Sequence, residues 1–223
     1  VSACASASNA MIDSLNYIRL GYADVIVTGG SEAAVTKAGI GGFNAMHALS
    51  KRNDDPKSAS RPFDKNRDGF VLGEGSGALI LESYEHAIAR GAKIYAEFSG
   101  GGLSADAYHM TAPHPEGLGA IKVMENCLKD ANTRLDEVDT INMHGTSTPL
   151  GDIAESNAIH SVLIGYKRGR FTGMIKPSGW MEKKSNQEKW EVLQNIAPLN
   201  EGALKVAAPD IWRRQRAFAD NYI

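Results

Sequence analysis

Cys4 is the first residue of this chain whose side chain could carry out covalent chemistry. It lies in VSACAS, directly before a segment with Met11, Leu15 and Ile18 at helical spacing. A thiolate is a nucleophile, and the dipole and free N–H groups of a helix N-terminus stabilise it. The small neighbours of Cys4 would let a substrate carbonyl approach and let backbone donors form an oxyanion hole. The alternative is a buried, inert thiol, which is the usual state of a lone cysteine.

His144 is the second candidate for chemistry. It follows the apolar run VDTINM and precedes the polar loop GTSTPLGD. At such a position an α/β sheet presents residues to a ligand. Thr146 and Thr148 alternate in this loop and could offer two hydroxyls to a polar substrate. The alternative is that His144 only caps a turn.

The other reactive residue types favour structural roles. Cys127 lies within a helical pattern among apolar residues, so we expect it in the core. His109 and His114 flank MTAP with no cysteine nearby, so a polar loop is a better interpretation than a metal site. DGFVLGEGSG is rich in glycine but lacks the GK[ST] of a phosphate-binding loop, which excludes that motif. Because no cysteine lies near His109 and His114, we also expect no bound metal.

Composition and charge exclude several classes of protein. Of the 223 residues, 43% are hydrophobic and 22% charged, as in ordinary globular proteins. No apolar run approaches the roughly 20 residues of a membrane helix, so we expect no membrane span. The first residues of the sequence show no pattern of a secretory signal. Two cysteines make no disulfide framework, which favours the cytoplasm.

The net charge of −2 hides an asymmetry between two parts of the chain. Residues 1–163 carry a net charge of −7, whereas residues 164–223 carry +5 and all three tryptophans. The basic residues of the second part are scattered among acidic and apolar ones, which is typical of a solvated face and not of a nucleic-acid site. The shift in composition predicts a boundary near residue 163.

Strand and helix patterns alternate along the first part. Short apolar runs closed by glycine predict buried strands, and 3.6-residue periodicity predicts helices. This alternation is typical of an α/β domain with buried sheets. The expected strands cover 23–30, 75–83, a segment beginning at 93, and the start of 138–152; the expected helices cover 4–20, 84–91, 116–132 and 152–163, with a short helix within 31–49.

Six motifs in order resemble one enzyme family. They are VSACASASNA, DVIVTGGSEA, GIGGFNAMHALS, SASRPFDKNRDGFVLGEGSGALILE, GGLSADAYHMTAPHPEG and INMHGTSTPLGDIAE. Together they resemble the β-ketoacyl-acyl-carrier-protein synthases of type II fatty acid synthesis, particularly the synthase II branch. The resemblance covers residues 1–163. Thiolases share the fold of that family but not the HGTSTPLGD loop.

The resemblance implies a fold, a reaction and partners. The fold is thiolase-like, with two α/β halves whose mixed sheets are covered by helices, and the family acts as a homodimer. Cys4 would take an acyl chain from an acyl carrier protein as a thioester. Malonyl carrier protein would then lose carbon dioxide, and the carbanion would attack that thioester. His144 corresponds to one of two histidines that stabilise the enolate, and no dissociable cofactor is implied.

The resemblance also assigns roles to residues around this pair. Thr146 and Thr148 correspond to threonines that bind the phosphopantetheine arm of the carrier protein. Phe43 corresponds to a residue that lines the acyl-chain pocket. Asp152 and Glu155 correspond to acids in the active-site network. These roles are implied by the resemblance alone.

The sequence departs from the family pattern at both ends. About half a domain would precede the cysteine in the family, and a KSMTGH-like segment with a second histidine would follow the HGTSTPLGD helix. No histidine follows His160 here. We therefore expect residues 1–163 to be a partial synthase domain, truncated at both ends, and residues 164–223 to be an unplaced tail with helices around 186–196 and 209–220. Without the second donor, we expect the chain alone to lack condensation activity.

Two other functions stay open at this point. The chain could be a non-catalytic fragment or partner module of a synthase assembly, because a sheet without its neighbours exposes edges that favour association. It could also be an acyl-transfer or thioester-hydrolysing enzyme that uses Cys4 and His144 alone.

Overall fold

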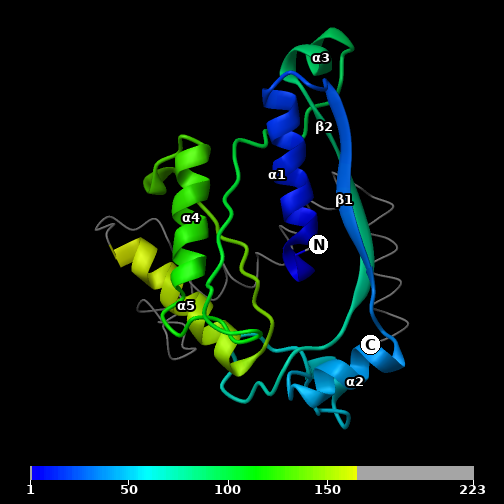
Figure 1. Cartoon of the computed structure of the whole chain (residues 1–223), viewed down its shortest axis with the longest axis vertical. Helices are drawn as coiled ribbons and strands as arrows, with labels where there is room; N and C mark the ends of the chain where they lie inside the picture. Colours follow the sequence, from blue (N-terminus) through cyan, green and yellow to red (C-terminus); the bar gives the residue numbers. More distant parts are fainter. Residues whose placement is uncertain (1, 165–223) are drawn as a thin grey trace, which may run out of the picture.

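A computed structural model describes residues 2–164 of the chain (Figure 1). Residues 165–223, which include the tail helices predicted around 186–196 and 209–220, lie outside the described residues. No helix in the described part is long and apolar enough to cross a membrane. The elements run in the order η1 (Ala3–Ala5), α1 (Ser6–Arg19), β1 (Val25–Ala33), α2 (Lys37–Ala45), η2 (Pro56–Ser58), β2 (Glu74–Glu82), α3 (Tyr84–Ala89), α4 (Leu118–Asp130), η3 (Leu135–Glu137) and α5 (Pro149–Ile164).

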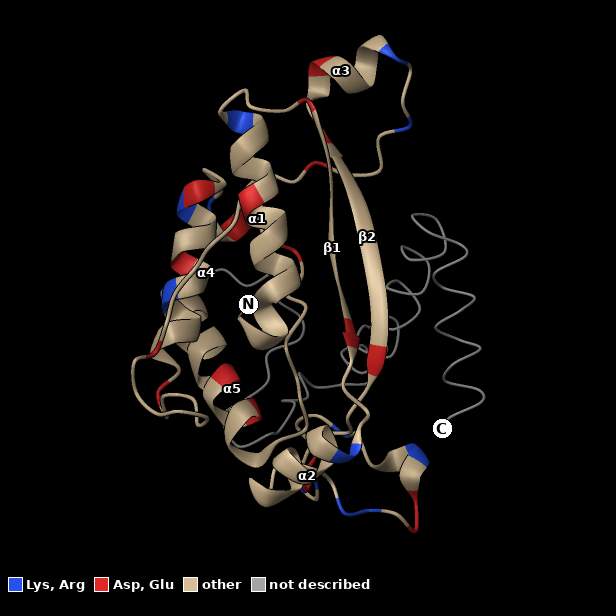
Figure 2. Ribbon diagram, turned by 45° about the vertical axis from the view of Figure 1, so that its right-hand side comes forward, with Lys and Arg blue, Asp and Glu red and all other residues tan. Residues whose placement is uncertain are grey.

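The two strands form one antiparallel sheet that lies along α1. Its register pairs Val25 with Glu82 at one end and Ala33 with Glu74 at the other. Figures 1 and 2 show α1 between this sheet and α4, with α5 crossing below α4. The positions of both strands confirm the sequence prediction, and so do the helices α1, α3, α4 and α5. The predicted burial of the strands is wrong.

Exposure along the sheet shows why the burial prediction fails. Thr28 is buried, but Val27 is 72% and Ile80 is 65% exposed. A strand becomes fully buried only when layers cover both of its faces. In the described part of the chain α1 packs against β1, and the large apolar side chains on the strands remain accessible.

A long segment without regular structure runs between α1 and α4. Arg19, at the end of α1, donates to both carboxylate oxygens of Asp130 at 3.1 and 3.0 Å and to the carbonyl of Ser99 at 2.6 Å. The amide of Gly101 donates to the same carboxylate at 2.9 Å. A side chain at Gly101 would collide with Ile12, since its Cβ would lie 2.3 Å from Cγ1 of that residue. The glycines therefore let this segment pass closely between two helices.

Two predicted strands are absent from the described residues. The segment that begins at 93 and the segment 138–144 have no ladder partner. A strand needs a neighbouring backbone with free donors and acceptors, whereas helices use theirs internally. The first segment passes between helices, and the backbone of the second ends on a side-chain carboxylate of α5. Their apolar composition is therefore not sufficient to make them strands.

The buried core is centred on α5. Ala154, Ala158, Ile159 and Leu163 are each at most 9% exposed. Gly117, which precedes α4 with a φ of +68°, lies against this helix so closely that its Cβ would be 2.4 Å from the carbonyl oxygen of Ala154. Glycine has no penalty for this left-handed conformation. The close contact holds the start of α4 on the first half of α5, where the candidate site lies.

Gly29 gives a test of the strand pairing. Its φ is +152°, and a Cβ there would lie 2.1 Å from the carbonyl oxygen of Gly77. We expect Gly29→Ala to lower the free energy of unfolding by at least about 2 kcal/mol, because the side chain must push β2 away in a strained backbone. The matched control is Gly77→Ala, which meets nothing within 4 Å. Equal urea midpoints for the two variants would contradict the described register.

A charge cluster joins the end of β2 to α3. The carboxylate of Glu82 accepts hydrogen bonds from Arg90, through Nε at 2.5 Å and Nη2 at 2.6 Å, and contacts Nδ1 of His86 at 2.5 Å. These hydrogen bonds, chiefly that from Arg90, lower the pKa of Glu82 from 4.5 to about 2. Because the folded-state pKa is depressed, the cluster stabilises the fold above pH 4.5 and stops doing so as the pH falls toward 2.

This charge cluster predicts a carboxyl titration that can be measured directly. In carbon-detected nuclear magnetic resonance we expect Glu82 to titrate near 2. Arg90→Met should move the pKa up toward 4.5, because it removes the largest source of the shift. Lys122→Met is the control, since Lys122 pairs with the exposed Glu125 elsewhere. An unchanged Glu82 titration in Arg90→Met would show that the cluster does not form.

Candidate active site

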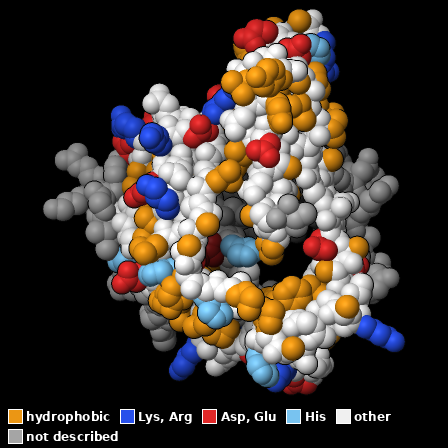
Figure 3. All heavy atoms as spheres, in the orientation of Figure 1, with side chains coloured by type: hydrophobic (Ala, Val, Ile, Leu, Met, Phe, Trp, Pro, Cys, Tyr) orange, Lys and Arg blue, Asp and Glu red, His pale blue; other side chains and the backbone are white. Residues whose placement is uncertain are grey.

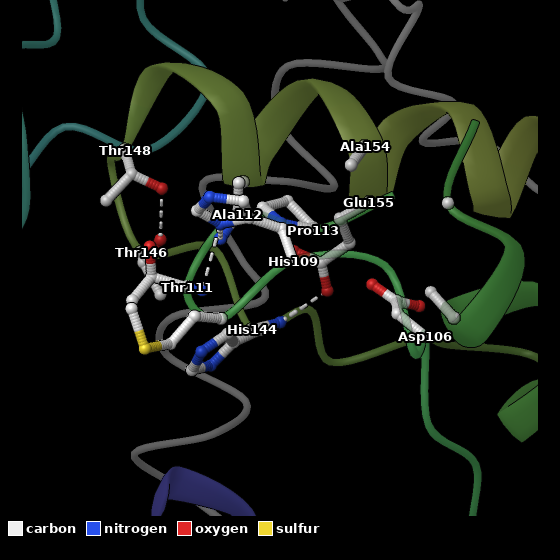
Figure 4. Close-up of a pocket in the computed structure, with 14 residues that line it drawn as sticks. Asp106, His109, Thr111, Ala112, Pro113, His144, Thr146, Thr148, Ala154 and Glu155 are labelled. Carbon is white, nitrogen blue, oxygen red and sulfur yellow. Dashed lines mark hydrogen bonds between the residues drawn. The ribbon is translucent and has the colours of Figure 1, made fainter. Parts of the chain in front are cut away.

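The loop that carries His144 is held by a carboxylate of α5. One oxygen of Glu155 accepts the amide of His144 at 2.6 Å, and the other accepts the amide of Gly145 at 2.9 Å. Hydrogen bonds to a charged acceptor are stronger than neutral ones. Glu155 lies in the second turn of α5, so this bidentate contact fixes the backbone of His144 relative to the helix (Figure 4).

Asp152 holds the next part of the same loop from a buried position. It is 1% exposed, and its two oxygens accept the amide of Ser147 at 3.1 Å and the amide of Phe63 at 2.7 Å. Nε of Arg67 lies 2.9 Å from the second oxygen. An unpaired charge at this depth would be strongly destabilising, and these partners supply the pairing.

The backbone conformation of Ser147 sets the relative position of Thr146 and Thr148 on either side of it. Its φ is +68°, an uncommon conformation for a residue other than glycine. Thr146 and Thr148 place their hydroxyl oxygens 2.9 Å apart, which is within hydrogen-bond distance. A side chain at Gly151 would lie 2.4 Å from the Thr148 hydroxyl oxygen, so the glycine keeps this pair accessible.

A cavity of about 480 Å³ lies over this loop. Figure 3 shows a hollow on this face of the molecule, with histidine and hydrophobic side chains along its edge. The sequence-predicted residues that line the cavity are His144, Thr146, Thr148 and Glu155. The structure therefore brings together four of the predicted site residues around one space, while Asp152 supports them from below.

The loop 109–113 forms another wall of the cavity, which sequence reasoning did not predict. Nδ1 of His109 accepts the amides of Thr111 at 3.1 Å and Ala112 at 3.0 Å, so the ring proton lies on Nε2 (Figure 4). Asp106 also lines the cavity. The histidine does shape a polar loop, as the sequence indicated, but the fold adds that this loop faces His144. Only the order of the motifs in the sequence could have suggested this placement.

Cys4 lies where the sequence predicted, at the start of a helix. It is in η1, directly before α1, and its side chain is exposed. Ala3 before it has a φ of +49°, which turns the chain sharply into the helix. In Figures 1 and 2 this end of α1 points toward the part of the molecule that contains α2 and α5. Cys4 is not among the residues that line the cavity over His144.

The second cysteine differs from the first in its surroundings. Cys127 is half-buried on α4, and its Sγ lies 4.0 Å from the carbonyl oxygen of Gly100. Burial, together with the charge of Asp130, raises the pKa of the Cys127 thiol above its usual value. A thiol with a raised pKa is a poor nucleophile at neutral pH. Cys127 therefore serves as an internal comparison for Cys4.

Phe43 lies on α2, away from the lining of the cavity. Its ring packs edge to face on Phe70, with centroids 5.1 Å apart and planes at 88°. The half-buried Phe43 thus holds α2 against the segment that precedes β2. Its suggested contact with an acyl chain remains a prediction.

Comparison with known proteins gives the family. Residues 1–87 match the model for the β-ketoacyl synthase N-terminal domain, and residues 95–176 match the model for its C-terminal domain. The chain belongs to the β-ketoacyl synthase family and has a thiolase-like fold. The resemblance inferred from the six motifs is confirmed.

Individual relatives agree with this assignment. The chain is 53% identical over 161 residues to chloroplastic 3-oxoacyl-acyl-carrier-protein synthase I of Arabidopsis thaliana, covering 72% of this chain and 34% of the relative. It is 53% identical over 163 residues to 3-oxoacyl-acyl-carrier-protein synthase 2 of Synechocystis, covering 73% and 39%. The chain thus spans between a third and two fifths of the length of these relatives.

Solved structures show the same relationship. One is a type II polyketide ketosynthase described in complex with its acyl carrier protein; it is 45% identical, with a TM-score of 0.70 over 72% of this chain and 40% of that one. Another is a β-ketoacyl synthase from Burkholderia phymatum, which is 34% identical with a TM-score of 0.70 over 87% of this chain and 47% of that one.

The contact of Glu155 with two amides can be tested by hydrogen exchange. Glutamine offers one acceptor oxygen, so Glu155→Gln must leave either the amide of His144 or that of Gly145 without a partner. We expect exchange at one of these amides to accelerate about tenfold or more, which corresponds to about 1.4 kcal/mol. Glu125→Gln, on the exposed side of α4, is the control. Unchanged exchange at both amides would show that the carboxylate does not hold this loop.

Proposed function

We propose that this chain is part of a condensing enzyme that extends an acyl thioester with malonyl carrier protein. The observation that carries the proposal is the grouping of His144 with the hydroxyls of Thr146 and Thr148 around one cavity. A histidine next to paired hydroxyls suits a substrate that has a polar arm and a reacting carbonyl.

The reaction begins at Cys4. Its thiolate attacks the acyl thioester, a new carbon–sulfur bond forms, and the carrier thiol leaves with a proton. A helix N-terminus favours the thiolate through its dipole, and Cys4 stands at the start of α1. Cys4 is exposed, whereas Cys127 is half-buried and has a raised pKa, so Cys4 is the more accessible thiol of the two.

His144 acts in the second step. When malonyl loses carbon dioxide, negative charge develops on the thioester oxygen, and an imidazole N–H can donate to it. The enolate carbon then attacks the acyl carbon on Cys4 and releases the thiolate. One such donor is worth roughly 10²–10³ in rate. Because Glu155 holds the backbone of His144, the ring has a defined starting position.

Thr146 and Thr148 suit the phosphopantetheine arm. Each hydroxyl can donate one hydrogen bond and accept others, which matches the amide groups of such an arm. The pair is half-buried at the cavity wall, where contacts with a ligand are less exposed to competition from water. The expected partner is therefore an acyl carrier protein, loaded in turn with acyl and malonyl groups.

We further propose an oligomeric state, a compartment and the step that this chain supports. The enzyme acts as a homodimer, which the exposed apolar side chains on the sheet support. It acts in the cytoplasm, which its two free thiols support. Condensation needs a second histidine as donor, and the 223 residues contain no histidine beyond His160. Acyl transfer to Cys4 does not need that donor and is therefore the step expected from this chain.

Transfer of an acyl group to the chain tests the proposal. Incubation with acyl-loaded carrier protein should add one acyl group to the intact mass, mapped to Cys4 by peptide analysis. Cys4→Ala should abolish the adduct and Cys127→Ala should retain it. Absence of the adduct, or an adduct on Cys127, would overturn the assignment. Steady release of free acid without a malonyl donor would instead identify a Cys–His thioester hydrolase.

A further inference from the structure

Arg67 lies in the motif DKNRDGF and has contacts that the steps above do not use. Nε lies 2.9 Å from an oxygen of Asp152 and 3.3 Å from the carbonyl oxygen of Thr148. Nη2 donates to the carbonyl of Pro149 at 2.7 Å, and Nη1 donates to that of Asp64 at 2.9 Å. One guanidinium therefore joins its own loop to the threonine loop and to the start of α5.

The burial of this ion pair makes it costly to disturb. The side chains of Arg67 and Asp152 are 9% and 1% exposed. A buried pair contributes only when geometry and hydrogen bonds are good, and loss of one partner leaves a buried charge. The planar guanidinium can reach a carboxylate and two carbonyls at once, which a lysine cannot do.

The helix dipole does not explain why a cation lies here. The N-terminus of a helix carries partial positive charge, which favours Asp152 in the first turn of α5 and opposes Arg67. Arg67 is offset by Asp152 and accepted by main-chain oxygens of the turn itself. The contacts of Arg67 therefore hold the turn in place, although the helix dipole itself does not favour a cation there.

The same carboxylate connects Arg67 to the threonine pair. Its other oxygen accepts the amide of Ser147, whose left-handed backbone separates Thr146 from Thr148. The hydroxyl of Ser147 accepts the amide of Arg61, so this residue is held from two directions. A non-glycine residue keeps such a backbone only where its surroundings enforce it.

We propose that Arg67 is a positioning residue for the arm-binding threonines. Through Asp152 and the carbonyls of Thr148 and Pro149, it holds the loop in the conformation that places the two threonine hydroxyls side by side. The inference rests on the proposed function, in which these hydroxyls bind the pantetheine arm. Arg67 lies under the loop and does not contact the substrate.

The experiment compares full-length variants for pantetheine binding by calorimetry and for exchange of the Ser147 amide. We expect Arg67→Met to weaken pantetheine about tenfold, which is about 1.4 kcal/mol, and to accelerate Ser147 exchange by a similar factor. Arg67→Lys keeps the charge without the fork and should weaken binding about threefold. Amide signals of α3 should not change, because α3 lies at the opposite end of the molecule from α5 (Figure 1).

Arg19→Met is the matched control. Arg19 also binds a carboxylate and a main-chain carbonyl, but it joins α1 to α4 far from the threonines. It should leave pantetheine affinity within about twofold of the wild-type value, as expected for a site without shared partners. Equal effects of Arg19→Met and Arg67→Met would overturn the positioning role.

The two readouts separate this inference from the proposed function. If the wild-type chain does not bind pantetheine, the arm site is wrong, and Ser147 exchange alone decides the role of Arg67. If Arg67→Met does not fold, Arg67→Lys decides it. Unchanged exchange and unchanged affinity in Arg67→Lys would then overturn the positioning role.

Discussion

The buried carboxylate of Asp152 is the interaction on which the rest of the candidate site depends. It joins the loop 63–67 to the threonine loop and the start of α5, more than 80 residues later, through the amide of Phe63, the amide of Ser147 and the side chain of Arg67. Because an unpaired charge in this position would be costly, these two parts of the chain have little freedom to move apart. The hydroxyl pair and the backbone of His144 are placed by this constraint and by Glu155.

Two kinds of contact with α5 therefore build the walls of the cavity. Carboxylates from the first turns of α5 bind the amides of the loop, and the close contact of Gly117 with α5 brings α4 and its preceding segment to the same place. The cavity forms between the loop and the residues before α4. A site that depends on several hydrogen bonds to main-chain groups is rigid, which favours binding a flexible arm in one conformation.

Local patterns in the sequence predict the helices, the two paired strands and the grouping of His144 with Thr146 and Thr148. They fail for the segment at 93 and for 138–144, where apolar composition indicates a strand but no partner strand is present in the described residues. They also miss Arg67 and the loop at His109. Those contacts join residues many positions apart, and no local period or spacing encodes such a pairing.

In the proposed reaction, Cys4 and the threonine loop act on one substrate. The most direct test is an experimental structure of the chain after Cys4 has been alkylated by the chloroacetyl amide of aminopantetheine, the pantetheine analogue in which an amine replaces the thiol. We expect the arm to lie over the hydroxyls of Thr146 and Thr148, with the Asp152–Arg67 pair intact beneath them. An arm that leaves Cys4 in another direction, with the threonine hydroxyls unoccupied, would contradict it.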